Sequence, residues 1–546
     1  MNIFQPKLFS SFKSYSKKQL VNDLVAGVIV AIIALPLSIA LAIASGVSPE
    51  KGIYTAIVAG FVIAFLGGSN VNISGPTAAF ATIVAGIVAQ FGTSGLVIAT
   101  IMAGLILIIM GICRFGSLIK YIPHTITTGF TSGIALTIVI GQIKDFLGLT
   151  FPEGMPTVET AEKVEAIAHS IATINWQALL MGGIALAILI VWPKISKKIP
   201  GSLIAVVVGV VVVKVFDMDV NTVGDLYTIS RDLPKFALPG FSFDTVKQLI
   251  PSAFTIAILA GIESLLSCVV SDGMINDKHN SNTELIAQGV GNICSGLFGG
   301  IPATGAIART AANVKNGGRT PVAGIVHAVV LLLVLVVLMP YAAWIPMPVI
   351  AAILFMVAYN MCEWRQFVKI CKTAPKSDII ALVVTFVLTV VFDLVVAIAV
   401  GMIIAVVLFM KRMADVANIR TWTKGGENSP DSERLKEIPE HTMVIEFEGP
   451  MFFASSEKFN SITFEEGVKT VILRMRNVPA LDSTAMRALN EIYSTCKKSD
   501  LKLILSHTNE QPLSVMKKAG FYDELGEENF LPNIDEALAY AESINK

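Results

Sequence analysis

Two short apolar segments of this chain, residues 67–81 and 299–309, are interrupted in the same way and lie in opposite halves. Each contains a Gly pair, a Pro, and a Thr among small residues, and an apolar helical run follows. Gly and Pro break the backbone hydrogen-bond ladder, which a membrane tolerates only where protein or a wet cavity covers the freed groups. Because Pro suits the first turn of a helix, we predict two half-helices that begin inside the membrane. A matched pair of such segments indicates a transporter's binding site.

The rest of the chain fits a membrane protein. Of its 546 residues 54% are hydrophobic, and the mean hydropathy is +0.70. That is too apolar for a soluble protein of this length, and the apolar residues form long runs. We predict about fourteen spans, several of them shorter than the roughly 20 residues of a full crossing. They lie near 24–44, 52–67, 75–91, 94–112, 122–147, 176–193, 201–216, 249–269, 283–298, 303–316, 320–340, 346–361, 378–392 and 394–411.

The charges orient these spans. If the N-terminus is inside, Lys and Arg gather in the inner loops, for example at 194–198 and 365–376, whereas the outer loop 146–175 is acidic. The outer segment 214–248 carries four basic residues and fits less well. An even number of spans leaves both termini cytoplasmic, so we predict a multi-pass protein of the inner or plasma membrane. Zero net charge argues against a nucleic-acid partner.

The broken segments are the third and the tenth spans, seven apart. Seven is odd, so two seven-span halves must be inverted relative to each other. We predict a cytoplasmic N-terminus at 1–20 and a transmembrane domain at 21–413, with repeats at about 21–216 and 249–413.

The composition changes after Ala414. A polar stretch at 414–437 is predicted to be a linker, and a soluble domain is predicted at 438–546. Strands and helices alternate in it, which indicates a small α/β domain. The expected strands are 442–447, 470–475 and 501–505, and the expected helices are 483–496 and 511–519.

Several motifs resemble those of the SulP anion-transporter family, the bacterial branch of the sulfate permease and SLC26 family. GGIPATGAIART at 299–310, followed by NGGRTP at 316–321, is similar to its tenth-span signature. SGPTA at 74–78 resembles the third-span motif, and GIESLLS at 261–267 resembles the eighth span. One departure is Leu37 after the first-span Pro, where many members have Gln.

The C-terminal domain resembles a STAS domain through GPMFFA at 449–454 and LDSTA at 481–485. The resemblance covers essentially the whole chain. It implies fourteen segments in two inverted repeats, a core domain that moves against a gate domain, and a homodimer. It also implies that the anion sits between the third and tenth half-helices.

Glu263 and Arg309 are the charged candidates. Glu263 is an acid inside an apolar run, so a functional role is the default interpretation. It is predicted to couple transport to a proton or to Na⁺; the alternative is a structural partner for Arg309. Arg309, about one and a half turns into the tenth half-helix, is predicted to add positive charge beside the anion, and the alternatives are a salt bridge or snorkelling.

The other candidates are small or hydroxyl-bearing residues. Thr77 and Thr304 offer hydroxyl donors or helix caps, and Phe80 is either core or site. Ser483 matches the position that is phosphorylated in other STAS proteins, and its alternative is a helix N-cap. The predicted helix-breaking residues are Gly75, Pro76 and Pro302, and the predicted backbone N–H donors are those of Ala78, Ala79, Gly305 and Ala306.

These residues predict a secondary active transporter for a small anion that works by alternating access. No second acidic ligand stands beside Glu263 in the sequence, so H⁺ is favoured over Na⁺ as the coupling ion. No nucleophile triad, P-loop or metal-binding spacing occurs, so no enzyme, cofactor or metal site is predicted. Sulfate ranks first by family frequency. Bicarbonate and C4-dicarboxylates are alternatives, and the runs 114–123 and 142–149 look closest to the dicarboxylate-carrying branch.

Two hypotheses come from other classes. In the first, the protein is an anion channel in which the same site conducts anions passively. In the second, it is a sensor in which the site reports anion binding through the STAS domain. The predicted partners are the small anion, the lipid bilayer, a second copy of the chain, and a cytoplasmic protein at the STAS domain.

Overall fold

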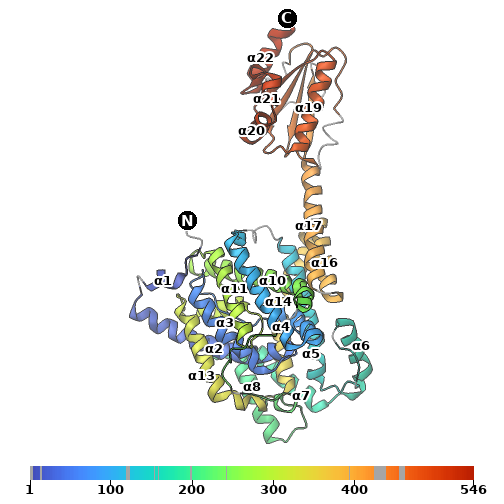
Figure 1. The fold of residues 1–546 in the computed structure, drawn as a ribbon. Helices are drawn as coiled ribbons and strands as arrows, with labels where there is room; N and C mark the ends of the chain where they lie inside the picture. The colour runs from blue at the N-terminus through green and yellow to red at the C-terminus, as the bar shows by residue number, and fades with distance from the viewer. Residues whose placement is uncertain are drawn as a thin grey trace. The chain divides into compact units, whose positions relative to one another are not determined.

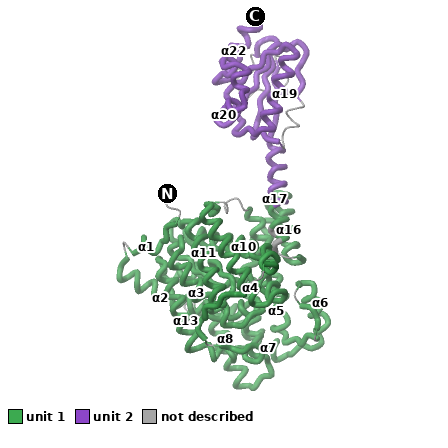
Figure 2. The backbone as a smooth tube through the Cα atoms, viewed as in Figure 1, with its two compact units in different colours: residues 1–402 green, residues 403–546 purple. Residues whose placement is uncertain are grey.

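The computed structural model describes residues 4–12, 15–117, 123–152, 154–157, 159–196, 199–230, 232–240, 243–392, 394–423, 438–453 and 462–546. The chain divides into two compact units, residues 1–402 and 403–546, which Figure 2 colours separately.

The first unit is built of helices (Figure 1). Within the described residues, eight helices are long and apolar enough to cross a bilayer. Each predicted span coincides with a helix, and the spans 75–91 and 94–112 share α4, which breaks at Gly92, where φ is 67°. The helices are α1 (Lys7–Ser11), α2 (Lys17–Ala44), α3 (Pro49–Leu66), α4 (Ala81–Ile112), α5 (His124–Leu147), α6 (Thr160–Ser170), α7 (Trp176–Ile195), α8 (Gly201–Val215), α9 (Val223–Leu226), α10 (Phe243–Ile275), α11 (Ser281–Leu297), α12 (Ile307–Lys315), α13 (Val322–Leu338), α14 (Met347–Cys362), α15 (Trp364–Thr373), α16 (Lys376–Val391) and α17 (Leu394–Val416).

The helices of this unit pack in two groups. In the first, α11 lies against α3 and α4, α10 lies against α4 and α12, and α13 lies against α2 and α3. In the second, α5 lies against α14 and α16, and α7 lies against α8 and α14. Helices of both repeats contribute to each group, which is the core and gate arrangement that the resemblance implies.

Two glycines set the contact of α4 with α11. A Cβ on Gly104 would lie 2.6 Å from the carbonyl oxygen of Gly289, and a Cβ on Gly289 would lie 2.5 Å from the carbonyl oxygen of Gly104. Each backbone therefore occupies the space that a side chain on the other would need. Small residues allow this close approach between helices in a membrane. Here they let α4 of the first repeat pack directly against α11 of the second.

The second unit holds a five-stranded sheet in the order β3-β4-β5-β6-β7. The strand β3 is antiparallel to β4, and the other neighbours are parallel. Side chains alternate between the two faces, so Ile445 and Leu473 pack toward α19, whereas Val444 and Ile472 pack toward α22. The elements are β3 (Asn418–Thr423), β4 (Thr442–Glu448), β5 (Thr470–Asn477), α19 (Ser483–Lys498), β6 (Lys502–Ser506), α20 (Glu510–Lys518), α21 (Phe521–Leu525), β7 (Phe530–Leu531) and α22 (Ile534–Asn545).

Two predictions about this unit need correction. The linker does not begin at 414, because α17 continues to Val416 and residues 418–423 form the edge strand β3; the remainder, 424–437, lies outside the described residues. Ser483 does not cap its helix. Asp482 is the N-cap of α19, and its carboxylate accepts a hydrogen bond from the Ala485 N–H at 2.8 Å, which leaves Ser483 exposed in the first turn.

Candidate anion-binding site at the crossing of the broken segments

The two broken segments cross as a short antiparallel ladder. It consists of β1 (Ser74–Gly75) and β2 (Thr304–Gly305), with Ser74 opposite Gly305. The Ala306 N–H extends the ladder by donating to the Ile73 carbonyl at 2.9 Å. Freed backbone groups of one segment are thus satisfied by the other, which is how irregular chain survives at membrane depth. The antiparallel direction agrees with inverted repeats.

Both half-helices begin later than the Pro positions predicted. Pro76 and Pro302 lie in extended chain, and helical structure starts at the turn η2 (Ala78–Phe80), which leads into α4, and at Ile307 in α12. Arg309 is therefore in the first turn of α12 rather than one and a half turns into it. The N–H groups that open these first turns, such as those of Ala78, Ala79 and Ile307, have no acceptor within their own helices, whereas the Phe80 N–H donates to the Thr77 carbonyl at 3.3 Å. Their positive dipole ends meet at the crossing.

Glycine is required on both sides of the crossing. A Cβ on Gly75 would lie 2.6 Å from Nη1 of Arg309, and a Cβ on Gly305 would lie 2.6 Å from Nδ2 of Asn72. Each glycine therefore leaves room for a polar side chain of the opposite broken segment: Gly75 for Arg309, and Gly305 for Asn72.

Arg309 is a buried cation at this point. Its side chain is 3% exposed, and Nη2 donates to the carbonyl oxygen of Pro76. Nη1 is buried and has no hydrogen-bond partner. A buried guanidinium with a free donor is costly unless an acceptor joins it, so the site is prepared for a negatively charged or strongly accepting group.

Glu263, on α10, faces the start of the first half-helix. Its carboxylate accepts a hydrogen bond from the Thr77 hydroxyl at 2.9 Å, and its side chain is partly exposed. Among the described residues there is no ion pair between Glu263 and Arg309, so the salt-bridge alternative does not describe this structure. Glu263 is an accessible acid beside the helix ends.

The remaining candidates divide into accessible and enclosed groups. Thr77 and Ala306 are half-buried, and Ile307 is 44% exposed, so they border the accessible side of the crossing. Phe80, Ala78 and Ala79 are buried. The backbone N–H of Ala306 is engaged in the ladder, which corrects its assignment as a free donor.

Neither threonine side chain makes a capping hydrogen bond, although Thr77 occupies the N-cap position of η2. The Thr77 hydroxyl donates to Glu263, and the Thr304 hydroxyl, which is buried, donates to the Ala260 carbonyl at 2.8 Å. Both hydroxyls bind the broken segments to α10, so each of them fixes the position of a half-helix start relative to the eighth span.

A buried acid that the sequence analysis did not identify, Glu284 on α11, lies behind the crossing. Its side chain is 1% exposed and accepts hydrogen bonds from the Gly68 N–H at 2.9 Å, Asn72 at 2.8 Å, Ser264 at 3.1 Å and Gln288 at 3.0 Å. Gln288 also donates to the Ser74 hydroxyl at 2.9 Å. The network links α10, α11 and the first broken segment. The sequence signal that could have identified this network is Glu284 followed four residues later by Gln288 in an apolar span.

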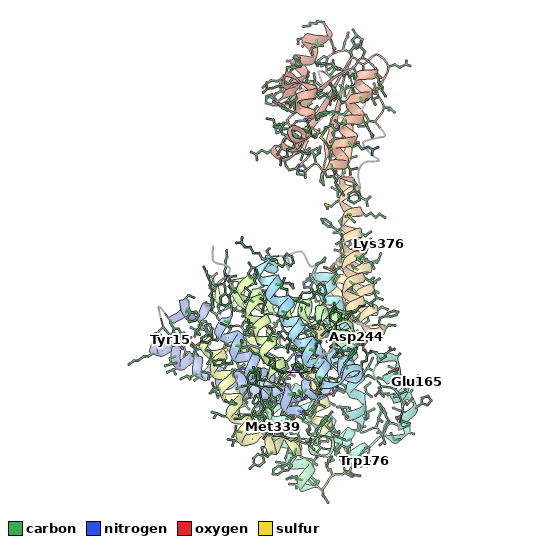
Figure 3. The ribbon with its side chains drawn as sticks, viewed as in Figure 1. Tyr15, Glu165, Trp176, Asp244, Met339 and Lys376 are labelled. Carbon is green, nitrogen blue, oxygen red and sulfur yellow. The ribbon has the colours of Figure 1, made fainter. Side chains whose placement is uncertain are left out.

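Asp23, near the start of α2, forms another buried acidic centre. It accepts hydrogen bonds from the Thr320 hydroxyl at 2.6 Å, the Arg319 N–H at 2.9 Å and the Tyr15 hydroxyl at 2.9 Å, and Tyr15 is marked in Figure 3. Burial and the hydrogen bond to Asp23 raise the pKa of Tyr15 to about 12. Tyr15 therefore stays a proton donor and helps to fasten the turn after α12 to the first span.

Helices that cross a membrane, with two broken segments whose positive ends meet beside a buried Arg and an accessible Glu, define a membrane transporter for anions. Comparison with known proteins gives the family. Residues 20–385 match the Sulfate permease family, and residues 433–537 match the STAS domain. The chain belongs to the sulfate permease family, and it carries a C-terminal STAS domain.

Its relatives are named as transporters of anions. The putative sulfate transporter YvdB of Bacillus subtilis is 40% identical over 96% of this chain and 98% of its own. The bicarbonate transporter BicA of Picosynechococcus is 31% identical over 95% of this chain and 94% of its own. The inward-facing structure of the murine anion transporter Slc26a9 superposes with a TM-score of 0.88 at 20% identity, over 98% of this chain and 94% of that one, and shows the shared fold.

Proposed function

We propose that this protein is a secondary active transporter that moves a small anion, with sulfate as the first candidate, by alternating access. The observation that carries the proposal is Arg309, a buried cation whose Nη1 has no partner at a point where two half-helix N-termini converge. An oxyanion supplies the acceptors that this group lacks, and the dipole ends add to the attraction.

Glu263 supplies the coupling in this proposal. An ionised carboxylate beside the anion site repels the anion, whereas a protonated carboxyl leaves Arg309 and the helix ends uncompensated. Proton and anion then favour each other's binding, and by linkage the effect is reciprocal. Thr77, which donates to Glu263 at 2.9 Å, lies between this acid and the first half-helix and so links protonation of Glu263 to anion binding.

H⁺ remains favoured over Na⁺ in this proposal. Glu284 is the nearest further acid in the network, since it contacts Ser264, the neighbour of Glu263. Its oxygens already accept four hydrogen bonds, so they are poorly suited to hold a cation as well.

Bicarbonate is the second candidate. BicA, which is named as a bicarbonate transporter, is 31% identical to this chain over nearly its whole length. The site offers one cation, which suits a monovalent anion as well as one charge of a divalent anion. We further propose a homodimer in the inner or plasma membrane with both termini and the STAS domain in the cytoplasm, where the exposed Ser483 is accessible to a protein partner.

Counterflow in proteoliposomes tests the proposal. Vesicles loaded with unlabelled sulfate, bicarbonate or a C4-dicarboxylate are diluted into the labelled form of each. A carrier gives a transient accumulation for its own substrate, and an imposed inward proton gradient should enlarge sulfate uptake. Dissipative flux without any overshoot would indicate a channel, and binding without flux would indicate a sensor; either result contradicts the proposal.

A further inference from the structure

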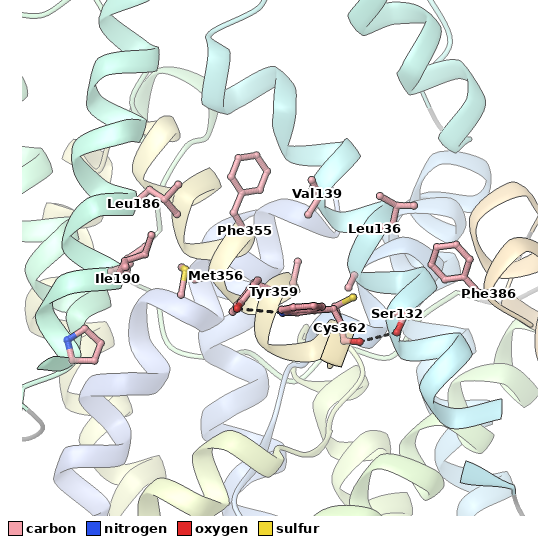
Figure 4. Close-up of a pocket in the computed structure, with 15 residues that line it drawn as sticks. Ser132, Leu136, Val139, Leu186, Ile190, Phe355, Met356, Tyr359, Cys362 and Phe386 are labelled. Carbon is pink, nitrogen blue, oxygen red and sulfur yellow. Dashed lines mark hydrogen bonds between the residues drawn. The ribbon is translucent and has the colours of Figure 1, made fainter. Parts of the chain in front are cut away.

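A cavity of about 990 Å³ lies between α5, α7, α14 and α16, and none of its lining residues belongs to the crossing (Figure 4). Its walls are apolar. Leu136 of α5 and Ile190 of α7 face Phe355 and Met356 of α14 across the space (Figure 4). This size lies at the upper end of the range for small-molecule sites, which is about 300–1,000 Å³.

The few polar groups of the cavity are already bonded to each other. The Ser132 hydroxyl donates to the Cys362 carbonyl at 2.7 Å, and the Trp364 indole donates to the Tyr359 hydroxyl at 3.3 Å. Leu136 is 37% exposed, so the cavity reaches the outer face of the helices, which is the lipid side in a membrane protein. The cavity therefore suits an apolar ligand that arrives from the bilayer.

A basic helix borders the cavity. Trp364 lines the cavity and is also the first residue of α15, and the Arg365 guanidinium lies 5.6 Å from its ring centroid. Phe367 of α15 packs edge-on against Phe386 of the cavity wall, with ring centroids 5.4 Å apart. The exposed side of this segment carries four cations, and the ion pairs of the described residues include none of them: Arg365, Lys369, Lys372 and Lys376, the last marked in Figure 3.

We propose that this place is a binding site for an anionic phospholipid, with an acyl chain in the cavity and the headgroup phosphate on the cations of α15 and of the start of α16. An apolar cavity next to cations that form no ion pair among the described residues matches the two parts of such a lipid. A second copy of the chain fits less well, because a symmetric contact brings the same four cations close to their own copies. Aromatic residues such as Trp364 and Tyr359 are typical of the level where headgroups begin.

Native mass spectrometry of the full chain, released from detergent after exchange into phosphatidylglycerol or phosphatidylcholine with the same acyl chains, tests the site. Wild-type protein should retain phosphatidylglycerol in preference to phosphatidylcholine. The K369Q/K372Q variant should reduce this preference at least about fivefold, since each surface cation attracts anionic lipid. K17Q/K18Q removes two exposed cations at the start of α2 and should leave the preference unchanged.

A second pair of variants tests the cavity. Leu186→Trp narrows it and should weaken the retention of both lipids, whereas Leu105→Trp, on an exposed position of α4, should not. Unchanged phosphatidylglycerol retention in K369Q/K372Q would overturn the proposal even if Leu186→Trp failed to fold. Loss of the dimer in Leu186→Trp with lipid retention intact would assign the surface to a second copy and would also overturn it.

Discussion

The two carboxylates near the crossing, Glu263 and Glu284, stand in contrasting surroundings. Glu284 accepts four hydrogen bonds and is 1% exposed. Glu263 is partly exposed, and it accepts a hydrogen bond from the Thr77 hydroxyl. Both acids lie in membrane helices, where an unsatisfied charge is costly. The protein has therefore satisfied one acid with fixed donors and left the other partly exposed beside the crossing.

The same contrast runs through the rest of the crossing. The side that holds Asn72, Ser264 and Gln288 is closed, and protein groups make its hydrogen bonds, although Oε1 of Gln288 has no partner among the described residues. The side that holds Thr77, Ala306 and Ile307 is accessible. Satisfaction of polar groups, rather than their mere presence in an apolar span, separates a scaffold from a binding site.

Glu284→Ala should have the largest effect. It removes the acceptor of four buried donors, so the core group of helices should lose about 3–5 kcal/mol of stability. The thermal midpoint of the detergent-purified protein, followed by size-exclusion chromatography, measures the loss. Glu263→Ala is the matched control and should lower the midpoint far less. Equal decreases of the thermal midpoint in the two variants would show that the two acids contribute equally to stability and would contradict the contrast between them.

Arg309→Ala should weaken anion binding by about 10- to 100-fold, because a charge-assisted hydrogen bond contributes roughly 1.5–3 kcal/mol. Arg309→Lys should weaken it less, since it keeps the charge and loses the planar fork. The effect should be larger for sulfate than for a monovalent anion, and the half-helix dipoles should leave residual binding. Isothermal titration of the three proteins decides the matter: identical affinities would place Arg309 outside the site.

Glu263→Gln should abolish gradient-driven accumulation while exchange and binding persist. The amide keeps the size and the hydrogen bond to Thr77 but cannot take up a proton. In wild-type vesicles uptake should increase as the external pH falls, because protonation removes the repulsion at the site; in the variant it should be independent of pH. A variant that still accumulates substrate with the wild-type pH profile would show that another group couples transport.

Removal of the chain after Asn428 should have the smallest effect on the site. Every proposed ligand precedes Arg319, so the affinity for the anion should stay within about twofold of the intact protein, a change of less than about 0.5 kcal/mol. Turnover or surface level is expected to fall. Loss of binding by a truncated protein that elutes as a single folded species would connect the STAS domain to the site.

The spans were predictable because bilayer thickness imposes a hydropathy signal on each of them. The two broken segments were predictable because Gly and Pro recur in the same order, with Thr among small residues, at 67–81 and 299–309. The hydrogen-bond partners of the residues within the site were not predictable. Whether the Thr304 hydroxyl meets the anion or Ala260, and whether the Ala306 N–H is free or bonded to Ile73, depends on segments that are distant in the chain.

The role of Glu284 could not be predicted from the sequence either. Its sequence position, in the first turn of an apolar helix, is compatible with an ordinary helix-capping acid. Only the fold brings Gly68 and Asn72 to it, across 216 and 212 residues of chain.

The antiparallel ladder between β1 and β2 also constrains how the protein is made. Ile73 donates its N–H to the Thr310 hydroxyl, 237 residues later in the chain. The ribosome delivers the first broken segment to the membrane long before its partner exists, so the backbone groups around Ser74 and Gly75 must wait without their final acceptors and donors. Unpaired backbone is tolerated in a bilayer only when protein or water covers it. Biogenesis of this chain therefore has an obligatory late step, the docking of the second half on the first, and the proposed substrate site forms at that step.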